Sequence, residues 1–289
     1  MTVARRVLVV GYLSMDTVQL PGAQPVQVPG GAALYAALGA RHAGAQAVIS
    51  AAVGEDFPRQ WLESLARLGI DVSGVQQRPG ATRTSRLNYD AAGGRESPHH
   101  HEAGWWERTI AMAPAPSGAA AAACDGVVAC PMAASALAAL LRWSRQHALP
   151  VVADTSDAFV ERDRDGLLRL VNQLQVFAPS REETRSLWPE LGDDAAAQAL
   201  AALGVNVVQK RGSQGAVAVS AHDVALVRLA APQTRVVDTT GAGDATVGAL
   251  AAMLAQGVSF LDAARAALHT GALATTGMGP AALGLGATV

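Results

Sequence analysis

Short apolar runs alternate along the chain with longer stretches in which apolar positions recur every three or four residues. The short runs are rich in valine and alanine and predict buried β-strands, whereas the longer spacing predicts helices. The predicted strands are 7–10, 47–53, 126–129, 151–154, 176–178 and 205–209, and the predicted helices are 31–42, 58–68, 135–147, 165–172, 181–187 and 194–203. This alternation indicates an α/β fold in which helices flank a central, mostly parallel sheet.

The pattern changes after Lys210. Residues 216–220 and 224–229 predict an antiparallel pair of strands, and two apolar helices follow, one beginning at Gly241 and the other at Phe260. We therefore expect a sheet that is parallel in its centre and antiparallel at one side.

One stretch does not follow the alternation of strands and helices. Residues 82–90 alternate polar and apolar positions like a half-exposed strand. Together with residues 17–28, the stretch 82–106 predicts a small β flap outside the main sheet. An excursion of this kind on an α/β core is typical of a lid or a binding loop.

Composition excludes several classes of protein. Of the 289 residues, 50% are hydrophobic and 16% are charged, which excludes a disordered chain. The formal net charge of −2 argues against a protein that coats nucleic acid, and an aromatic content of 4% argues against a stacking platform for single strands. We expect no nucleic-acid partner.

Cysteines and apolar segments bear on the compartment. Cys124 and Cys130 are too few for a disulfide framework or a four-thiolate metal site. The first residues lack a secretory pattern, and no apolar run is long enough to span a membrane. The sequence therefore predicts a cytoplasmic protein with no membrane partner.

Lys210 is the only lysine in the chain. A P-loop requires a glycine followed by lysine and then by serine or threonine. Lys210 lies between Gln209 and Arg211, so the chain contains no P-loop. A phosphate site, if present, must be built in another way.

The strongest chemical signal is the segment from Asp238 to Thr246, which leads into an apolar helix. Gly241 and Gly243 allow a sharp turn that presents backbone N–H groups, and at a helix N-terminus such groups form an anion-binding nest. Asp244 follows the nest and is placed to take a proton from an attacking hydroxyl group. The alternative is an aspartate that only complements the helix dipole.

A second signal lies near the start of the chain. Asp16 follows the first predicted strand, and Gly30 and Gly31 open the first predicted helix. Ligands of open α/β sheets bind beyond the carboxyl ends of the strands, so Asp16 is suited to hold substrate hydroxyl groups. An ordinary turn and helix cap would also explain these residues.

The two signals occur in a familiar combination and order. The chain resembles the PfkB (ribokinase-like) family of small-molecule kinases in the glycine pair at 30–31, in 53–57, in 210–215 and in 238–244. The resemblance covers essentially the whole chain. It implies a single ribokinase-like domain over 1–289, with a small β lid formed by about 17–28 and 82–106 that often makes a homodimer interface.

The resemblance also implies roles for individual residues. The catalytic group comprises Asp244 as base and Gly241, Ala242 and Gly243 as anion hole. The substrate group comprises Asp16, Gly30, Gly31, Tyr35 and Arg83. The nucleotide group comprises Ser180, Lys210, Arg211, Gly212 and Gly215. Glu183 matches a glutamate that organises Mg²⁺ through water, and Asp238 lies at the position of a monovalent-cation site.

Two residues depart from the family pattern. Ser180 stands where an asparagine is usual before Glu183, which puts the organisation of Mg²⁺ or phosphate in question. Tyr35 stands where many sugar kinases have a substrate-facing asparagine, which argues against a generic ribose or fructose specificity. Arg83 can pair with an anionic substrate group or serve as a solvated strand residue.

We therefore expect ATP-dependent phosphorylation of a hydroxyl group on a small sugar, polyol or nucleoside, with Mg²⁺ and, by resemblance, K⁺. Myo-inositol is one such polyol, because Thr82, Tyr89 and Arg95 resemble residues of some inositol-kinase-like members. The alternatives are a non-catalytic sensor of a sugar or nucleotide and a pyrimidine or thiazole vitamin-precursor kinase. A dinucleotide-dependent dehydrogenase is disfavoured, because residues 11–16 lack its glycine fingerprint.

Overall fold

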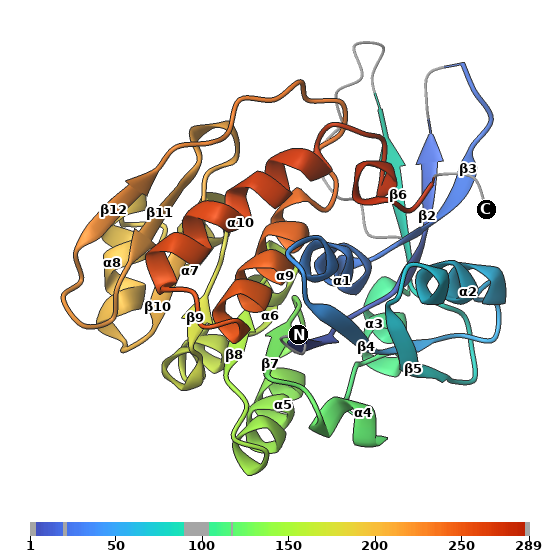
Figure 1. Ribbon diagram of the computed structural model, residues 1–289, viewed down its shortest axis with the longest axis horizontal. Coiled ribbons are helices and arrows are strands. Elements are labelled where there is room, and N and C mark those ends of the chain that lie inside the picture. Colours follow the sequence, from blue (N-terminus) through green and yellow to red (C-terminus); the bar gives the residue numbers. More distant parts are fainter. Residues whose placement is uncertain (1–3, 20–21, 90–103, 117, 287–289) are drawn as a thin grey trace.

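The computed structural model describes residues 4–19, 22–89, 104–116 and 118–286. Its centre is a nine-stranded sheet in the order β12-β11-β10-β9-β8-β7-β1-β4-β5 (Figure 1). These strands are β1 (Arg6–Val10), β4 (Gln46–Val53), β5 (Asp71–Gln77), β7 (Gly126–Ala129), β8 (Val151–Ala153), β9 (Val176–Phe177), β10 (Asn206–Lys210), β11 (Ala216–Val219) and β12 (Leu226–Leu229).

The sheet is parallel from β5 to β10 and antiparallel at β11 and β12. Its central strands are buried on both faces, which explains why β1 and β7 are continuous apolar runs. The expected α/β fold with a mostly parallel sheet is confirmed.

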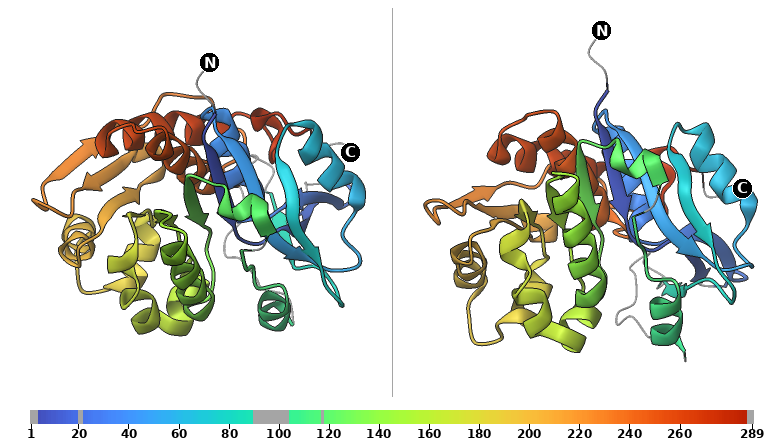
Figure 2. Two further views of the ribbon diagram at one scale, coloured as in Figure 1. Left: turned by 60° about the horizontal axis from the view of Figure 1, so that its bottom comes forward. Right: turned by 90° about the horizontal axis from the view of Figure 1, so that it is seen from below.

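Helices cover both faces of the sheet (Figure 2). One face carries α1 (Ala32–His42), α2 (Arg59–Arg67), α9 (Ala242–Ala255) and α10 (Phe260–Ala274). The other carries α4 (Gly118–Ala122), α5 (Ala134–Gln146), α6 (Asp157–Leu168), α7 (Arg181–Leu187) and α8 (Asp193–Ala202). Each layer buries its own apolar cluster against the sheet.

Helices α1 and α9 approach one another at two glycines. A methyl carbon built on Gly39 of α1 would lie 2.2 Å from the carbonyl oxygen of Ala245, and one built on Gly248 of α9 would lie 1.9 Å from that of Ala36. Neither position has room for a side chain. The backbones of α1 and α9 are therefore in direct contact.

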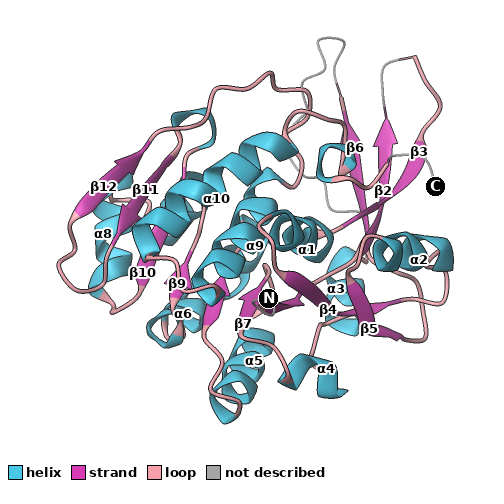
Figure 3. Cartoon of the chain, in the orientation of Figure 1, coloured by secondary structure: helices cyan, strands magenta, loops and turns pink. Residues whose placement is uncertain are grey.

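A second, three-stranded sheet lies beside the main one (Figure 3). It comprises β2 (Ser14–Gln19), β3 (Val26–Gly30) and β6 (Thr84–Asn88), with β2 antiparallel to β3 and parallel to β6. Only three residues separate β1 from β2, so this small sheet begins where the first main strand ends. The expected small separate sheet is confirmed, and residues 90–103 of the predicted lid, Arg95 among them, lie outside the described residues.

Several element bounds differ from the predictions. The helix expected at 165–172 begins at Asp157 and is kinked at Asp163, whose backbone is non-helical; residues 171–173 form a separate 3₁₀ turn. The charged run 161–165 hides the helical period there. Strand β5 was not predicted, because it is an edge strand that pairs only with β4 and carries Gly74.

Two short helices also escaped prediction. Helix α3 (Trp105–Ala111) occupies the end of the predicted flap, where a β element was expected, and α4 occupies an alanine-rich stretch. Two further 3₁₀ turns lie at Gly212–Gln214 and Ala281–Leu283. Within the described part of the chain, every helix is too short or too polar to cross a membrane.

Candidate active site

The ends of the parallel strands bring polar residues together at one edge of the main sheet. Asp154 follows β8, Ser180 follows β9 after a short connection, and Lys210 is the last residue of β10. Lys210 and Ser180 form a parallel bridge, so their backbones are neighbours. The carboxyl ends of parallel strands are where open α/β sheets bind ligands. This edge is the candidate active site.

The turn before α9 has the backbone geometry that the predicted anion-binding nest requires. Gly241 caps the helix in the left-handed conformation, with φ 72° and ψ 2°. A methyl carbon built on it would lie 2.1 Å from ring atoms of Tyr35, so only glycine fits. The first-turn N–H groups of α9 and its dipole make this turn, Gly241–Gly243, a favourable place for an anion.

Asp244 lies in the first turn of α9, beside the nest. Loss of water contact raises its pKa to about 7, and the charge of Asp154 adds to this rise, while Lys210 and Arg83 act in the opposite direction. A carboxyl group with a pKa near 7 can both accept and release a proton at neutral pH. This is the property that a general base requires.

Lys210 and Asp154 form an ion pair that is shielded from solvent. The Nζ atom of Lys210 donates to Oδ2 of Asp154, and the two side chains are 13% and 5% exposed. Nζ also lies beside the nest, because a methyl carbon built on Gly243 would be 3.4 Å from it. A positive charge is thus held next to the anion-binding turn.

Ser180 and Glu183 form a capping box at the start of α7. The Glu183 N–H donates to Ser180 Oγ (3.1 Å), and the Ser180 N–H donates to Glu183 Oε2 (2.6 Å). Burial raises the pKa of Glu183 to about 8, and the charge of Asp154 adds to the rise. Ser180, which stands in the position of the usual asparagine, therefore serves as a helix cap.

The site contains carboxyl groups of the kind that Mg²⁺ prefers. The charge of Asp154 acts on both Glu183 and Asp244, so the three groups lie near one another. Mg²⁺ usually keeps several waters and phosphate oxygens beside its carboxylate ligands. Among the described residues, His, Cys, Asp and Glu do not form a group of three that could hold a metal ion by themselves. The expected role of Glu183 in organising Mg²⁺ through water stays a prediction.

Asp16 and the glycine pair lie on the small-sheet side of the site. Asp16 is 5% exposed and accepts a hydrogen bond from Ser14 Oγ (2.7 Å). Its carboxylate lies against Gly30, where a methyl carbon would come within 1.9 Å of Oδ2. Gly31 precedes α1 with φ 97°. The structure therefore brings the three predicted substrate residues together.

Arg83 lies between two aromatic rings. Its guanidinium carbon is 4.8 Å from the ring centroid of Tyr12 and 4.9 Å from that of Trp105. Burial lowers its pKa, whereas the charges of Asp16 and Asp244 raise it. Its Nε atom and the Tyr12 hydroxyl group are buried without a hydrogen-bond partner in the described structure. Arg83 is therefore a half-buried residue just before β6, held between two rings, rather than a solvated strand arginine.

Tyr35 and Asp238 lie around the nest. Tyr35 is 4% exposed, and burial raises its pKa well above the ordinary value, with the charge of Asp16 adding to the rise. Asp238 accepts backbone hydrogen bonds from Thr240 (2.9 Å) and Gly279 (2.8 Å). It thereby ties the loop before the nest to the loop after α10. The predicted contacts of Tyr35 with substrate and of Asp238 with K⁺ stay predictions.

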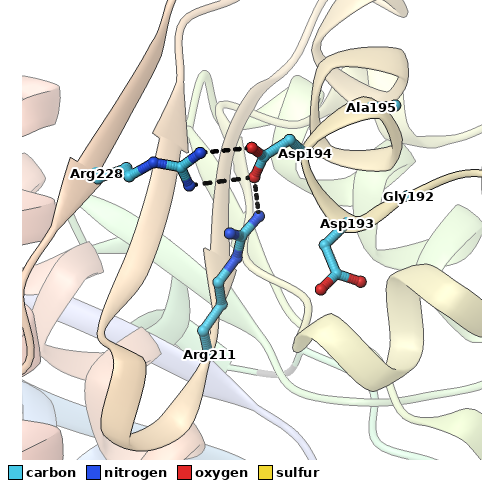
Figure 4. Close-up of a pocket in the computed structure, with 6 residues that line it drawn as sticks. All are labelled: Gly192, Asp193, Asp194, Ala195, Arg211 and Arg228. Atoms are coloured by element: carbon cyan, nitrogen blue, oxygen red, sulfur yellow. Dashed lines mark hydrogen bonds and ion pairs between the residues drawn. The ribbon is translucent and has the colours of Figure 1, made fainter.

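Arg211 points away from the rest of the nucleotide group. It pairs with Asp194 (2.7 Å), which also pairs with Arg228 (2.6 Å), beside a pocket lined by residues from the start of α8, from the turn after β10 and from β12 (Figure 4). Lys210 ends β10 and pairs with Asp154 at the site, whereas Arg211 lies in the turn after β10 and pairs with Asp194 of α8. Gly212 and Gly215 form the turn after β10. The structure does not bring Arg211 together with the nest.

Sequence reasoning missed Asp154 and Tyr12. Asp154 was placed at the end of a predicted strand, and the argument applied to Asp16, an aspartate just past a parallel strand, would have found it. Tyr12 gave no signal, because its role depends on where Arg83 and Trp105 lie in three dimensions.

Comparison with known proteins agrees with this geometry. The model of the pfkB family carbohydrate kinases matches residues 4–284. A cytidine kinase of Thermococcus kodakarensis is 28% identical over 266 residues, which cover 91% of this chain and 93% of that protein. The chain therefore belongs to the pfkB carbohydrate kinase family and is a small-molecule kinase.

Two solved structures share the fold. A nucleoside kinase of Burkholderia thailandensis in complex with inosine has a TM-score of 0.76 at 19% identity, covering 95% of this chain and 92% of that one. A ribokinase II candidate from E. coli in complex with ATP and Mg²⁺ has a TM-score of 0.74 at 22% identity, covering 96% and 94%. The predicted ribokinase-like fold is confirmed.

Proposed function

We propose that the chain transfers the γ-phosphoryl group of ATP to a hydroxyl group of a nucleoside, sugar or polyol. The single observation that carries this proposal is Asp244 in the first turn of α9, beside the nest, with its pKa raised to about 7. A proton acceptor next to an anion-binding turn is the minimal equipment for phosphorylating an alcohol.

In the proposed reaction, the acceptor oxygen attacks the γ-phosphorus in line, and the bond to the bridging oxygen breaks so that ADP leaves. The hydroxyl proton passes to a carboxylate oxygen of Asp244. The turn Gly241–Gly243 receives the transferring phosphoryl group at the N-terminus of α9. Mg²⁺, when bound, neutralises phosphate charge, and Glu183 would hold it through water.

We place the acceptor between Asp16, the glycine pair and Arg83. The carboxylate of Asp16 can accept hydrogen bonds from acceptor hydroxyl groups, while the unpartnered Nε of Arg83 offers a donor. We place ATP along the edge formed by Ser180, Lys210, Gly212 and Gly215. The ATP and Mg²⁺ complex of the E. coli neighbour supports this donor.

Nucleosides are the first acceptors to examine. The T. kodakarensis relative is named a cytidine kinase, and the B. thailandensis neighbour is a nucleoside kinase seen with inosine. We rank cytidine first, then inosine, then sugars and polyols such as ribose and myo-inositol.

The small sheet is the proposed lid. The hydroxyl groups of Tyr89, just past β6, and Thr240, just before the nest, are 3.2 Å apart and hydrogen-bonded, which links this sheet to the site. A closed lid would exclude water and limit hydrolysis of ATP. We expect the same sheet to form a homodimer interface, since Val26 of its edge strand β3 is 55% exposed. We expect the reaction to run in the cytoplasm, where ATP is supplied and where free cysteines such as Cys124 stay reduced.

The test is ADP release from MgATP with each acceptor, with and without K⁺. We expect release that depends on one class of acceptor and that disappears in Asp244→Asn. ATP binding with no release on any acceptor would contradict the proposal and favour a sensor. Release that persists in Asp244→Asn would contradict the assignment of the base.

A further inference from the structure

We propose that Lys210 is a catalytic residue: its ammonium group contacts the transferring phosphoryl group at the nest, and Asp154 positions it there. This inference rests on the proposed kinase function and deepens it. It concerns the chain's own lysine, for which the sequence implied only a place near the nucleotide.

The ammonium group of Lys210 lies beside the nest. A methyl carbon built on Gly243, the last glycine of the nest, would be 3.4 Å from Nζ. The backbone of Lys210 is fixed by the ladder of β10 and by donation of its N–H to Pro179 (2.9 Å). A residue at the end of a central strand is positioned more rigidly than one on a free loop.

Asp154 limits where the ammonium group can lie. Its Oδ2 accepts from Nζ, while its Oδ1 accepts the Thr155 N–H (2.9 Å). Both oxygens are therefore engaged, and the carboxylate is itself anchored to the backbone. The long lysine side chain is thus held in one orientation before any substrate binds, which reduces the entropy lost when a phosphate arrives.

The carboxyl groups around Lys210 keep its side chain charged. Asp154, Glu183 and Asp244 act on the ammonium group, and their charges outweigh burial, so the pKa of Lys210 is raised and the group stays positive. A cation held beside the nest can stabilise negative charge on a phosphoryl group bound there.

In the reaction, Lys210 transfers no proton. The acceptor proton goes to Asp244, and Lys210 stabilises negative charge on the oxygens of the phosphoryl group while the bond to ADP breaks. Removing one preorganised donor of this kind costs a factor of about 10²–10³ in kcat. Ser180 adds to the need for this cation, because its hydroxyl group is already used to cap α7.

The single lysine makes a direct test possible. Untagged protein labelled with lysine carrying ¹³C at Cε and ¹⁵N at Nζ gives one side-chain signal, that of Lys210. We expect saturating Mg²⁺ with the non-hydrolysable analogue AMP-PNP to shift this signal clearly more than MgADP does, because only the analogue carries the third phosphoryl group. An unmoved Lys210 signal, while backbone amides of Gly241 and Gly243 shift, would overturn the inference.

Steady-state kinetics of Lys210 variants provide a second test. Lys210→Met should lower kcat about 10²–10³-fold with the KM for ATP changed by no more than about threefold, and Lys210→Arg should restore part of kcat. Arg185→Met, which removes an exposed pair with Asp193, is the matched control and should leave kcat unchanged. A folded Lys210→Met variant with near-normal kcat would overturn the inference.

The outcomes separate this inference from the proposed function. If AMP-PNP shifts no signal and no acceptor yields ADP, the kinase proposal fails first. If the wild-type protein is active and binds AMP-PNP, but the Lys210 signal does not shift and Lys210→Met keeps its kcat, only the proposed role of Lys210 is wrong. Should Lys210→Met not fold, the labelled wild-type protein still decides.

Discussion

Lys210 and Arg211 are adjacent, carry the same charge, are similarly buried (13% and 11% exposed) and each pair with an aspartate, yet the two aspartates lie in different settings. In the inner pair, Asp154 is 5% exposed, whereas in the outer cluster Asp194, which Arg211 shares with Arg228, is 41% exposed. The pKa of Asp194 is lowered by its two arginines, while the pKa of Asp154 is raised by burial despite its lysine.

The difference shows that solvation, more than pairing, decides what a charged group can do. Water screens the outer cluster, so its carboxylate is a stable anion with little effect on its neighbours. Loss of water at the inner cluster leaves Asp244 and Glu183 poised near neutral pH. Each prediction below tests one side of this contrast.

The largest effect is expected at the base. Asp244→Asn should lower kcat by about two to four orders of magnitude, the range for losing a positioned base. MgATP affinity should change little, because the nest is backbone. Calorimetric titration alongside steady-state kinetics would measure both, and a normal kcat would exclude Asp244 as the base.

Breaking the inner pair should also destabilise the fold. Lys210→Met leaves Asp154 buried without its partner, which typically costs about 3–5 kcal/mol in the free energy of unfolding. Replacing both partners, with Lys210→Met and Asp154→Leu together, should recover much of this loss. Urea denaturation of the wild type, the single variant and the double variant would measure these differences in the free energy of unfolding. A single variant as stable as wild type would mean that the pair is open to water.

The pH dependence should reveal the inner carboxyl group. A base must be deprotonated to accept a proton, so kcat/KM should rise with pH, with a midpoint near 7, and level off above it. Lys210 lowers the pKa of Asp244 and Asp154 raises it, so Lys210→Met should move the midpoint up and Asp154→Asn should move it down. Midpoints that move in the same direction would contradict this electrostatic picture.

The smallest effect is expected in the exposed cluster around Asp194. Arg228→Met removes one of two arginines from an exposed carboxylate, and we expect no measurable change in Tm or kcat. Differential scanning calorimetry and the ADP assay are sufficient. A clear loss of activity would show that the pocket at Asp194 takes part in catalysis, and the contrast between the two clusters would fail.

Much of this arrangement could be predicted from the sequence. The run from Asp238 to Thr246 predicted a nest and a base, because two glycines at the start of an apolar helix expose backbone N–H groups next to an aspartate. The alternation of short valine-rich strands and helices indicated the fold. Both signals are local, and local patterns survive without knowledge of the rest of the chain.

The rest depended on contacts between distant segments. Lys210 and Arg211 were expected in one nucleotide group, but Lys210 pairs with Asp154 and Arg211 with Asp194, and neither partner could be identified from the sequence. The stacking of Arg83 on Tyr12 and Trp105 joins three segments whose packing no periodicity reveals. Helix α6 was misplaced because the charged run 161–165 hides its helical period.

The close approach of α1 and α9, at Gly39 against Ala245 and at Gly248 against Ala36, has a consequence for the reaction cycle. Helix α1 begins beside the proposed acceptor position and α9 beside the nest, and two helices whose backbones touch cannot slide or separate without losing that contact. The gap between acceptor and donor is therefore set by a rigid spacer and changes little during turnover. We expect product to leave by displacement of the small sheet, so catalytic turnover should be limited by how fast that sheet opens rather than by flexing of the main body.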